Sequence, residues 1–232
     1  MVSSSSISPT YNRLVSPKIE PFELNVDRYE KWFEIHDNVY RSELKAIRSI
    51  LTKFSQGLEI GVGTGRFSKP FNIQNGIEPA KNALRIASSR GVEGVQAVGE
   101  ALPYSNWSFD LALIVTTICF FSDVGLSLKE AFRVVRPRGS VVIGFVDKDS
   151  KLGKMYQERR EESPFYGAAE FYSANEVKEF LERTGFVNLI FIQTIFKTLA
   201  EIKRIEPIKR GYGEGSFVVV RATRPNRTAG ME

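Results

Sequence analysis

The chain has 232 residues, of which 42% are hydrophobic and 25% charged, a composition typical of one globular domain with a sizeable core. A single cysteine excludes internal disulfides and multi-thiolate metal sites, and a single histidine excludes a histidine-rich metal centre. The net charge of +5 arises from basic residues interleaved with acidic ones, which indicates a solvated surface and argues against a nucleic-acid partner.

The sequence has no pattern typical of a secretion signal or a membrane span. Residues 1–10 are serine-rich and lack the basic start and apolar core of a signal peptide. The longest apolar run, residues 111–121, contains two threonines and is shorter than the ~18 residues that a membrane helix needs. We therefore expect a cytoplasmic protein that does not insert into a membrane.

The predicted elements begin with a flexible segment and a helical cap. Residues 1–24 contain four consecutive serines and three prolines, which predicts an extended or frayed segment. In residues 25–55 the apolar positions recur at roughly helical spacing, which predicts one or two helices.

Strands and helices then alternate along the chain. The predicted strands are 57–62, 76–78, 92–98, 109–117 and 140–146. Predicted helices begin at Phe67 and span 81–90 and 124–135. This alternation predicts an α/β fold with a mostly parallel sheet and helices on both faces.

The C-terminal third contains a candidate lid and two further strands. Residues 148–172 are rich in charge and aromatic rings, which predicts a substrate lid or, alternatively, aromatic contacts with the core. The capping box Ser173–Glu176 starts a helix that Gly185 ends. The β-rich segments 187–196 and 216–223 are predicted to pair antiparallel, because no strong helix separates them.

The first strand ends in a glycine-rich loop, Glu59-Ile60-Gly61-Val62-Gly63-Thr64-Gly65. Glycine lacks a Cβ, so a ligand can lie against bare peptide groups, and the next helix directs its free N–H groups at that ligand. A dinucleotide site requires a third glycine where this chain has Arg66. The spacing therefore disfavours an NAD-dependent dehydrogenase.

Four further segments follow in order. Glu78 ends the second strand, where a carboxylate can accept hydrogen bonds from a ribose diol. The others are Ala97–Tyr104, Trp107–Asp110 and Glu130–Gly139. Together these segments resemble class I S-adenosylmethionine-dependent methyltransferases, closest to the ubiquinone/menaquinone-type (methyltransferase type 11) small-molecule branch, over roughly residues 29–223.

The resemblance implies a Rossmann-like seven-stranded sheet with one antiparallel strand, a single domain over residues 25–232, and S-adenosylmethionine as cofactor. The cofactor-binding residues that it implies are Glu59, Gly61, Gly63, Thr64, Gly65, Glu78, Pro79, Gly99, Glu100, Ala101, Thr116 and Thr117. Glu59 could instead only orient the loop, and the threonines could simply reflect strand preference.

The sequence departs from the family pattern at two positions. Val98 stands where many members have an acid that accepts from the adenine amino group, so Glu100 is a possible substitute. Phe120 stands where many members have a histidine, so no base is carried over from that position.

Candidate catalytic residues are His36, the only imidazole, and Asp147, which follows the fifth strand. A packing histidine and a solvated turn are the alternatives for these two positions. Tyr29, Trp32 and Tyr166 are candidate walls of a substrate pocket.

The predicted function is methyl transfer by in-line displacement to a small-molecule acceptor. In such a reaction the protein mainly aligns the reactants, which can contribute ~7–11 kcal/mol. An RNA methyltransferase and a non-catalytic S-adenosylmethionine-binding module are the alternatives. The sequence does not define the oligomeric state.

Overall fold

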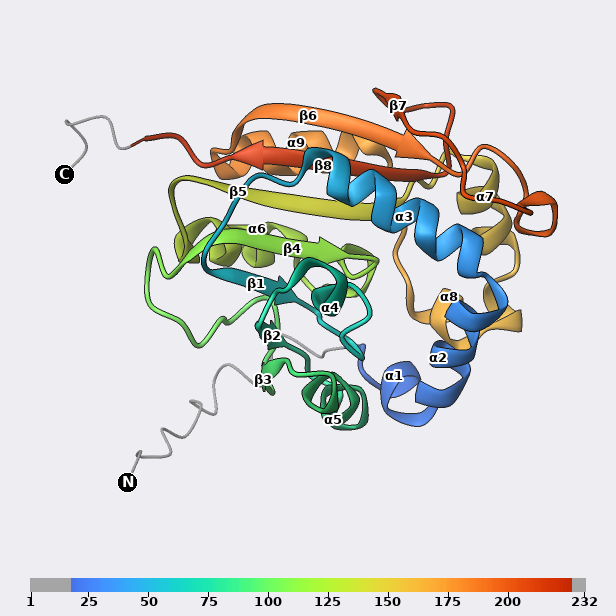
Figure 1. Ribbon diagram of the computed structural model, residues 1–232, viewed down its shortest axis with the longest axis horizontal. Coiled ribbons are helices and arrows are strands. Elements are labelled where there is room, and N and C mark those ends of the chain that lie inside the picture. Colours follow the sequence, from blue (N-terminus) through green and yellow to red (C-terminus); the bar gives the residue numbers. More distant parts are fainter. Residues whose placement is uncertain (1–17, 227–232) are drawn as a thin grey trace.

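The computed structural model describes residues 18–226, which form one sheet with helices on both faces (Figure 1). The strands are β1 (Gly57–Ile60), β2 (Asn75–Ile77), β3 (Glu93–Val95), β4 (Phe109–Val115), β5 (Val135–Val146), β6 (Val187–Thr194), β7 (Lys209–Arg210) and β8 (Phe217–Thr223). The α-helices are α1 (Glu20–Leu24), α2 (Val26–Ile35), α3 (Asp37–Ile50), α4 (Ser68–Phe71), α5 (Lys81–Ser89), α6 (Val124–Val134), α7 (Lys151–Glu158), α8 (Pro164–Ala168) and α9 (Ala174–Thr184). Short 3-10 helices are η2 (Ile118–Phe120), η3 (Arg160–Glu162) and η4 (Leu199–Glu201).

The sheet has the strand order β3-β2-β1-β4-β5-β8-β6-β7. It is parallel from β3 to β5, and β8 runs antiparallel between β5 and β6. This arrangement confirms the predicted Rossmann-like α/β fold and the antiparallel pairing of the last two predicted strands. The predicted number of seven strands is one too low, because β7 adds a second antiparallel strand beside β6. A two-residue strand of Lys209 and Arg210 has no hydrophobic period to reveal it.

Two buried clusters lie on opposite faces of the sheet. On one face α3 packs Ala46 and Ile47 with alternate residues of β4 and β8. On the other face α6 and α9 pack Leu128 and Leu181 (Figure 1). The central strands are buried on both sides, which explains their nearly continuous apolar sequences.

Both ends of α9 are formed by the residues that the sequence predicts. The Ser173 side chain and the Glu176 side chain form the reciprocal capping box that starts α9. Gly185 ends that helix in a left-handed conformation, with φ of 99°. The predicted capping box and helix end are therefore confirmed.

Residues 20–24 differ from the predicted extended segment, because they form helix α1. Pro21 lies in the first turn and is buried, and the Phe22 ring contacts the rings of Phe120 and Phe165 at centroid distances of 4.8 and 5.2 Å. Long-range aromatic packing thus orders a segment that has weak local signals. The rest of the predicted flexible segment, residues 1–17, lies outside the described residues.

Helices α1, α2 and α8 gather at the end of the sheet to which β4 points (Figure 1). The predicted cap consists of α2 and α3, and the candidate lid contains α7, η3 and α8. Within residues 18–226, no helix is both long enough and apolar enough to span a membrane.

Candidate functional site

A cavity lies where the carboxyl ends of the central strands meet α1, α2 and the candidate lid. Ligands bind at this position in open α/β sheets. Among the residues predicted from sequence to form the site, those that line the cavity are Tyr29, Trp32, Gly61, Gly63, Glu78, Pro79, Gly99, Glu100, Thr116, Thr117 and Tyr166. The fold therefore brings together residues that are up to 137 positions apart, from Tyr29 to Tyr166.

The glycine loop closes one side of the cavity with backbone in a left-handed conformation. Gly61, Gly63 and Gly65 have φ values of 73°, 52° and 80°. A Cβ on Gly61 would overlap the Thr117 side chain, whereas a Cβ on Gly65 would lie 3.3 Å from the α5 backbone at Ala87. Close packing therefore excludes a Cβ at Gly61 and crowds one at Gly65, whereas Gly63 presents its backbone to the cavity.

Glu78 lies at the end of β2 and is tied to this loop. Its Oε2 accepts the Gly63 backbone N–H at 3.0 Å, and its Oε1 accepts the Ala80 N–H at 2.9 Å. The side chain is 6% exposed and lines the cavity. Burial raises the pKa of Glu78 to about 7, although both backbone hydrogen bonds favour the ionised form.

Glu59 has a different environment from the one predicted for a cofactor ligand. It is 1% exposed, does not line the cavity, and accepts a hydrogen bond from the Ser68 hydroxyl beneath the loop. Burial raises the pKa of Glu59 to about 8. In this geometry Glu59 joins β1 to the start of α4, which agrees with the alternative that it orients the loop.

Thr64 and Gly65 also lie outside the cavity lining, and the Thr64 side chain turns toward α2. The Thr64 hydroxyl donates to Glu30 at 2.5 Å, and Glu30 forms ion pairs with Arg66 and Arg90, each at 2.5 Å. Burial opposes ionisation of Glu30, yet these hydrogen bonds together lower its pKa to about 2. We call these four residues, Glu30, Thr64, Arg66 and Arg90, the Glu30 cluster.

The segment Ala97–Tyr104, which contains Val98, also contributes to the cavity. Gly99 and Glu100 line it, whereas Ala101 does not. A Cβ on Gly99 would lie 2.6 Å from the Phe121 ring. The Glu100 carboxylate accepts the backbone N–H groups of Ser122 and Asp123, at 2.7 and 3.2 Å. The Glu100 side chain thus connects this segment to the turn before α6.

The end of β4 contributes two threonines to the cavity. Thr116 has a positive φ of 50°, which is uncommon for a residue with a branched Cβ. The one hydrogen of the Thr117 hydroxyl is shared between the Gly61 carbonyl, at 3.1 Å, and the Val115 carbonyl, at 2.9 Å. The hydroxyl therefore holds the end of β4 against the glycine loop.

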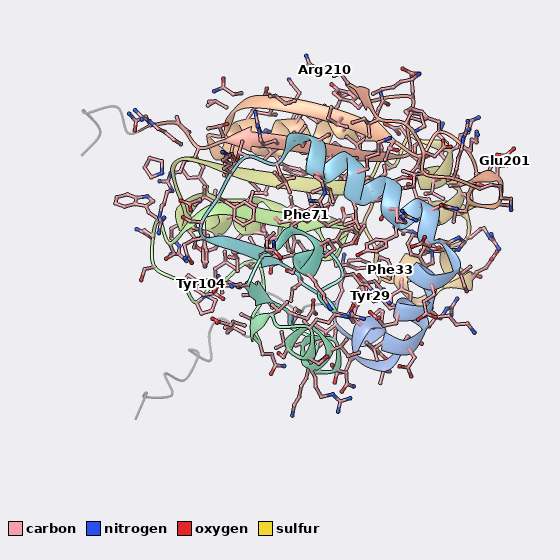
Figure 2. All side chains as sticks on the ribbon, in the orientation of Figure 1. Tyr29, Phe33, Phe71, Tyr104, Glu201 and Arg210 are labelled. Carbon is pink, nitrogen blue, oxygen red and sulfur yellow. The ribbon has the colours of Figure 1, made fainter. Side chains whose placement is uncertain are left out.

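Aromatic side chains form much of the remaining wall. Tyr29 and Phe33 lie together on α2, with ring centroids 5.0 Å apart (Figure 2). Tyr166, from the candidate lid, stacks on Tyr156 of α7 at 4.2 Å. Burial and nearby carboxylates raise the pKa of Tyr29, so its hydroxyl stays protonated at neutral pH.

The two candidate catalytic residues do not line the cavity. His36 lies between α2 and α3, where its ring is 5.0 Å from Trp32 and burial lowers its pKa. Asp147 is 5% exposed and accepts the backbone N–H groups of Asp149 and Ala174 at 2.9 and 3.2 Å. Asp147 therefore fastens the start of the lid segment to the start of α9.

Sequence reasoning did not select Glu43, although it lines the cavity and is 4% exposed. A sequence signal for it does exist. Glu43 occupies a position of the apolar stripe of α3, four residues after the buried Val39 and four before the buried Ile47. A charged residue in such a stripe is a candidate for function.

The sequence comparisons agree with this geometry. Residues 58–143 match a family model described as a methyltransferase domain. A Thermotoga maritima crystal structure, described as a SAM-dependent methyltransferase and possible histamine N-methyltransferase, has a TM-score of 0.87 and 43% sequence identity, covering 89% of this chain and 99% of that one. The chain therefore belongs to the class I S-adenosylmethionine-dependent methyltransferases.

Two curated relatives extend this comparison. An uncharacterised protein of Methanocaldococcus jannaschii is 44% identical over 201 residues, which is 87% of this chain and 97% of the relative. The demethylmenaquinone methyltransferase of Lactococcus lactis is 28% identical over 133 residues, which is 49% of this chain and 53% of that enzyme.

Proposed function

We propose that this protein binds S-adenosylmethionine and transfers its methyl group to a small-molecule acceptor. The observation that carries the proposal is one cavity lined both by the glycine loop with Glu78 and by aromatic side chains. The first set of residues suits a nucleoside and the second set suits an apolar acceptor.

The residues present fit the cofactor. One carboxylate oxygen of Glu78 accepts the Gly63 N–H and the other accepts the Ala80 N–H, and each oxygen keeps a lone pair for a ribose hydroxyl. Gly61, Gly63 and Gly99 each present their backbone to the cavity. When bound, the cofactor would supply an electrophilic methyl group on a sulfonium.

The chain's own contribution is alignment and exclusion of water. Phe33 and Tyr156, which lie on α2 and α7, are buried and form part of the cavity wall. A dry wall of this kind strengthens interactions with the sulfonium charge, and holding the acceptor in line with the S–CH₃ bond lowers the entropic barrier. His36 and Asp147 take no part in proton transfer in this mechanism, because neither side chain lines the cavity.

An amine is the acceptor type that the comparisons favour. The Thermotoga maritima relative, 43% identical, is described as a possible histamine N-methyltransferase. The aromatic walls agree with an acceptor of that size and ring character.

Calorimetric titration with S-adenosylhomocysteine tests the proposed cofactor. The wild-type protein is expected to bind it, and Glu78→Ala to bind it roughly tenfold to a hundredfold more weakly, because hydrogen bonds to a carboxylate are lost. Glu93→Ala, which removes an exposed glutamate from β3, is the control and should bind as wild type does. Wild-type protein without measurable binding, or with binding that is insensitive to Glu78→Ala, would contradict the proposal.

Transfer of a labelled methyl group to a metabolite pool tests the acceptor. A labelled small molecule supports the proposal, whereas binding of the cofactor with no transfer to any pool favours the non-catalytic alternative. Turnover on RNA that falls steeply with added salt would favour the RNA alternative, because phosphate contacts weaken with ionic strength.

A further inference from the structure

Glu43 is a buried glutamate whose carboxyl group has no hydrogen-bond partner or counter-ion among the described residues. It lies in the middle of α3, is 4% exposed, and lines the cavity. Within residues 18–226 no side chain or backbone group hydrogen-bonds or ion-pairs with it, whereas Glu30, Glu59 and Glu78 all have such partners. Burial raises the pKa of Glu43 to about 8, and no described cation counteracts that effect.

A buried carboxylate without a partner is costly unless something pairs with it. Glu43 lies near the Tyr29 ring, whose pKa is raised by burial and also by several carboxyl groups, including Glu59, Glu78 and Glu43. Carboxyl groups are therefore concentrated around this wall, and a bound cation would favour their ionised form. A cavity of this kind, with aromatic faces beside a carboxylate, attracts a cation.

We propose that Glu43 binds a protonated amine inside this cavity, which rests on the proposed function above. A charged amine can donate hydrogen bonds to both carboxylate oxygens, and the attraction is strong because the site is shielded from water. The amine has two possible sources, the methionine ammonium of the cofactor and the ammonium of an amine acceptor. Glu59, a carboxylate that the sequence resemblance places among the cofactor-binding residues, is buried beneath the loop and does not line the cavity.

Calorimetry with Glu43→Gln tests the proposal, because glutamine keeps the shape and removes the charge. One arm compares S-adenosylhomocysteine, which has the ammonium, with 5′-methylthioadenosine, which lacks it. The other arm compares histamine and tyramine with 4-ethylphenol, which has an aromatic ring and no amine, each titrated with and without S-adenosylhomocysteine. Glu206→Gln is the matched control, because Glu206 is 3% exposed but does not line the cavity.

Loss of at least about tenfold in S-adenosylhomocysteine affinity, with 5′-methylthioadenosine unchanged, assigns Glu43 to the cofactor's ammonium. The same loss of affinity for histamine or tyramine, with the affinity for 4-ethylphenol unchanged, assigns Glu43 to the ammonium of the acceptor. Equal affinities in wild type and Glu43→Gln for every ligand overturn the proposal, as does an equal loss for the ligands without an amine.

Binding by the wild-type protein separates the proposed function from the role of Glu43. Wild-type protein that binds neither S-adenosylhomocysteine nor 5′-methylthioadenosine contradicts the proposed function, and the amine arm alone then decides the role of Glu43. If the wild type binds no amine in that case, the inference is overturned too. Thermal unfolding of each variant confirms that the cavity is still folded.

Discussion

At the scale of single residues, the cavity depends on backbone that only glycine adopts without strain. Gly61 has a φ of 73° and faces the Thr117 side chain, which itself donates to the Gly61 carbonyl. The loop and the end of β4 therefore pack directly against each other at Gly61 and Thr117. A methyl group on Gly61 would overlap the Thr117 side chain.

Gly61→Ala is expected to lower the free energy of unfolding by about 1–3 kcal/mol and to weaken S-adenosylhomocysteine binding. Gly211→Ala is the matched control, because Gly211 has a φ of 85° but a Cβ there would meet nothing within 4 Å. Gly211→Ala therefore measures the backbone strain alone, whereas Gly61→Ala adds the steric clash with Thr117. Urea unfolding and calorimetry measure both effects, and Gly61→Ala that binds the ligand as tightly as wild type would contradict the prediction.

At the scale of elements, the Glu30 cluster connects three separate parts of the fold. Glu30 lies on α2, Thr64 and Arg66 follow β1, and Arg90 ends α5. Two ion pairs at 2.5 Å, with Glu30 17% exposed, hold α2 over the glycine loop. The position of Tyr29, the preceding residue, depends on this contact.

Glu30→Gln is expected to lower the free energy of unfolding by about 1–3 kcal/mol, because two guanidinium groups lose their carboxylate. The folded-state pKa of Glu30, about 2, is below its ordinary value of 4.5. Its contribution is therefore complete above about pH 4.5 and is lost as pH falls toward 2.

Denaturant unfolding of Glu30→Gln and wild type from pH 7 to pH 3 checks this prediction. The difference between them should be constant near neutral pH and should shrink at the acidic end. Glu34→Gln, an exposed glutamate on the same helix, should stay within about 0.5 kcal/mol of wild type. A difference that does not depend on pH would show that the carboxylate charge is not what stabilises α2.

At the scale of the whole molecule, the candidate lid and α9 depend on the end of β5. Asp147 accepts N–H groups from Asp149 at the start of the candidate lid and from Ala174 at the start of α9. Both N–H groups belong to segments that cover the sheet, so one carboxylate holds the starts of both segments at the end of β5. This structural position accounts for the burial of Asp147 without a catalytic role.

Asp147→Ala is expected to destabilise the protein by about 1–3 kcal/mol and to leave S-adenosylhomocysteine affinity within about twofold. Asp149→Ala, which removes an exposed side chain but keeps the backbone N–H, should have little effect on either property. Thermal unfolding and calorimetry measure the two effects. A variant of normal stability that has lost methyl transfer would instead restore Asp147 as a catalytic residue.

Features that depend on neighbouring residues could be predicted from the sequence. The spacing of three glycines, the acid that ends β2, the capping box at Ser173 and the alternation of strands and helices all act locally, and the parallel sheet follows from them. The side chains that face the cavity are selected by packing between segments that are distant in sequence. Glu59 turns toward Ser68, His36 and Asp147 lie outside the lining, and Glu43 lies within it. Side-chain direction and burial arise from packing between distant segments, such as Phe22 of α1 against Phe165 of α8, and no local pattern encodes such contacts.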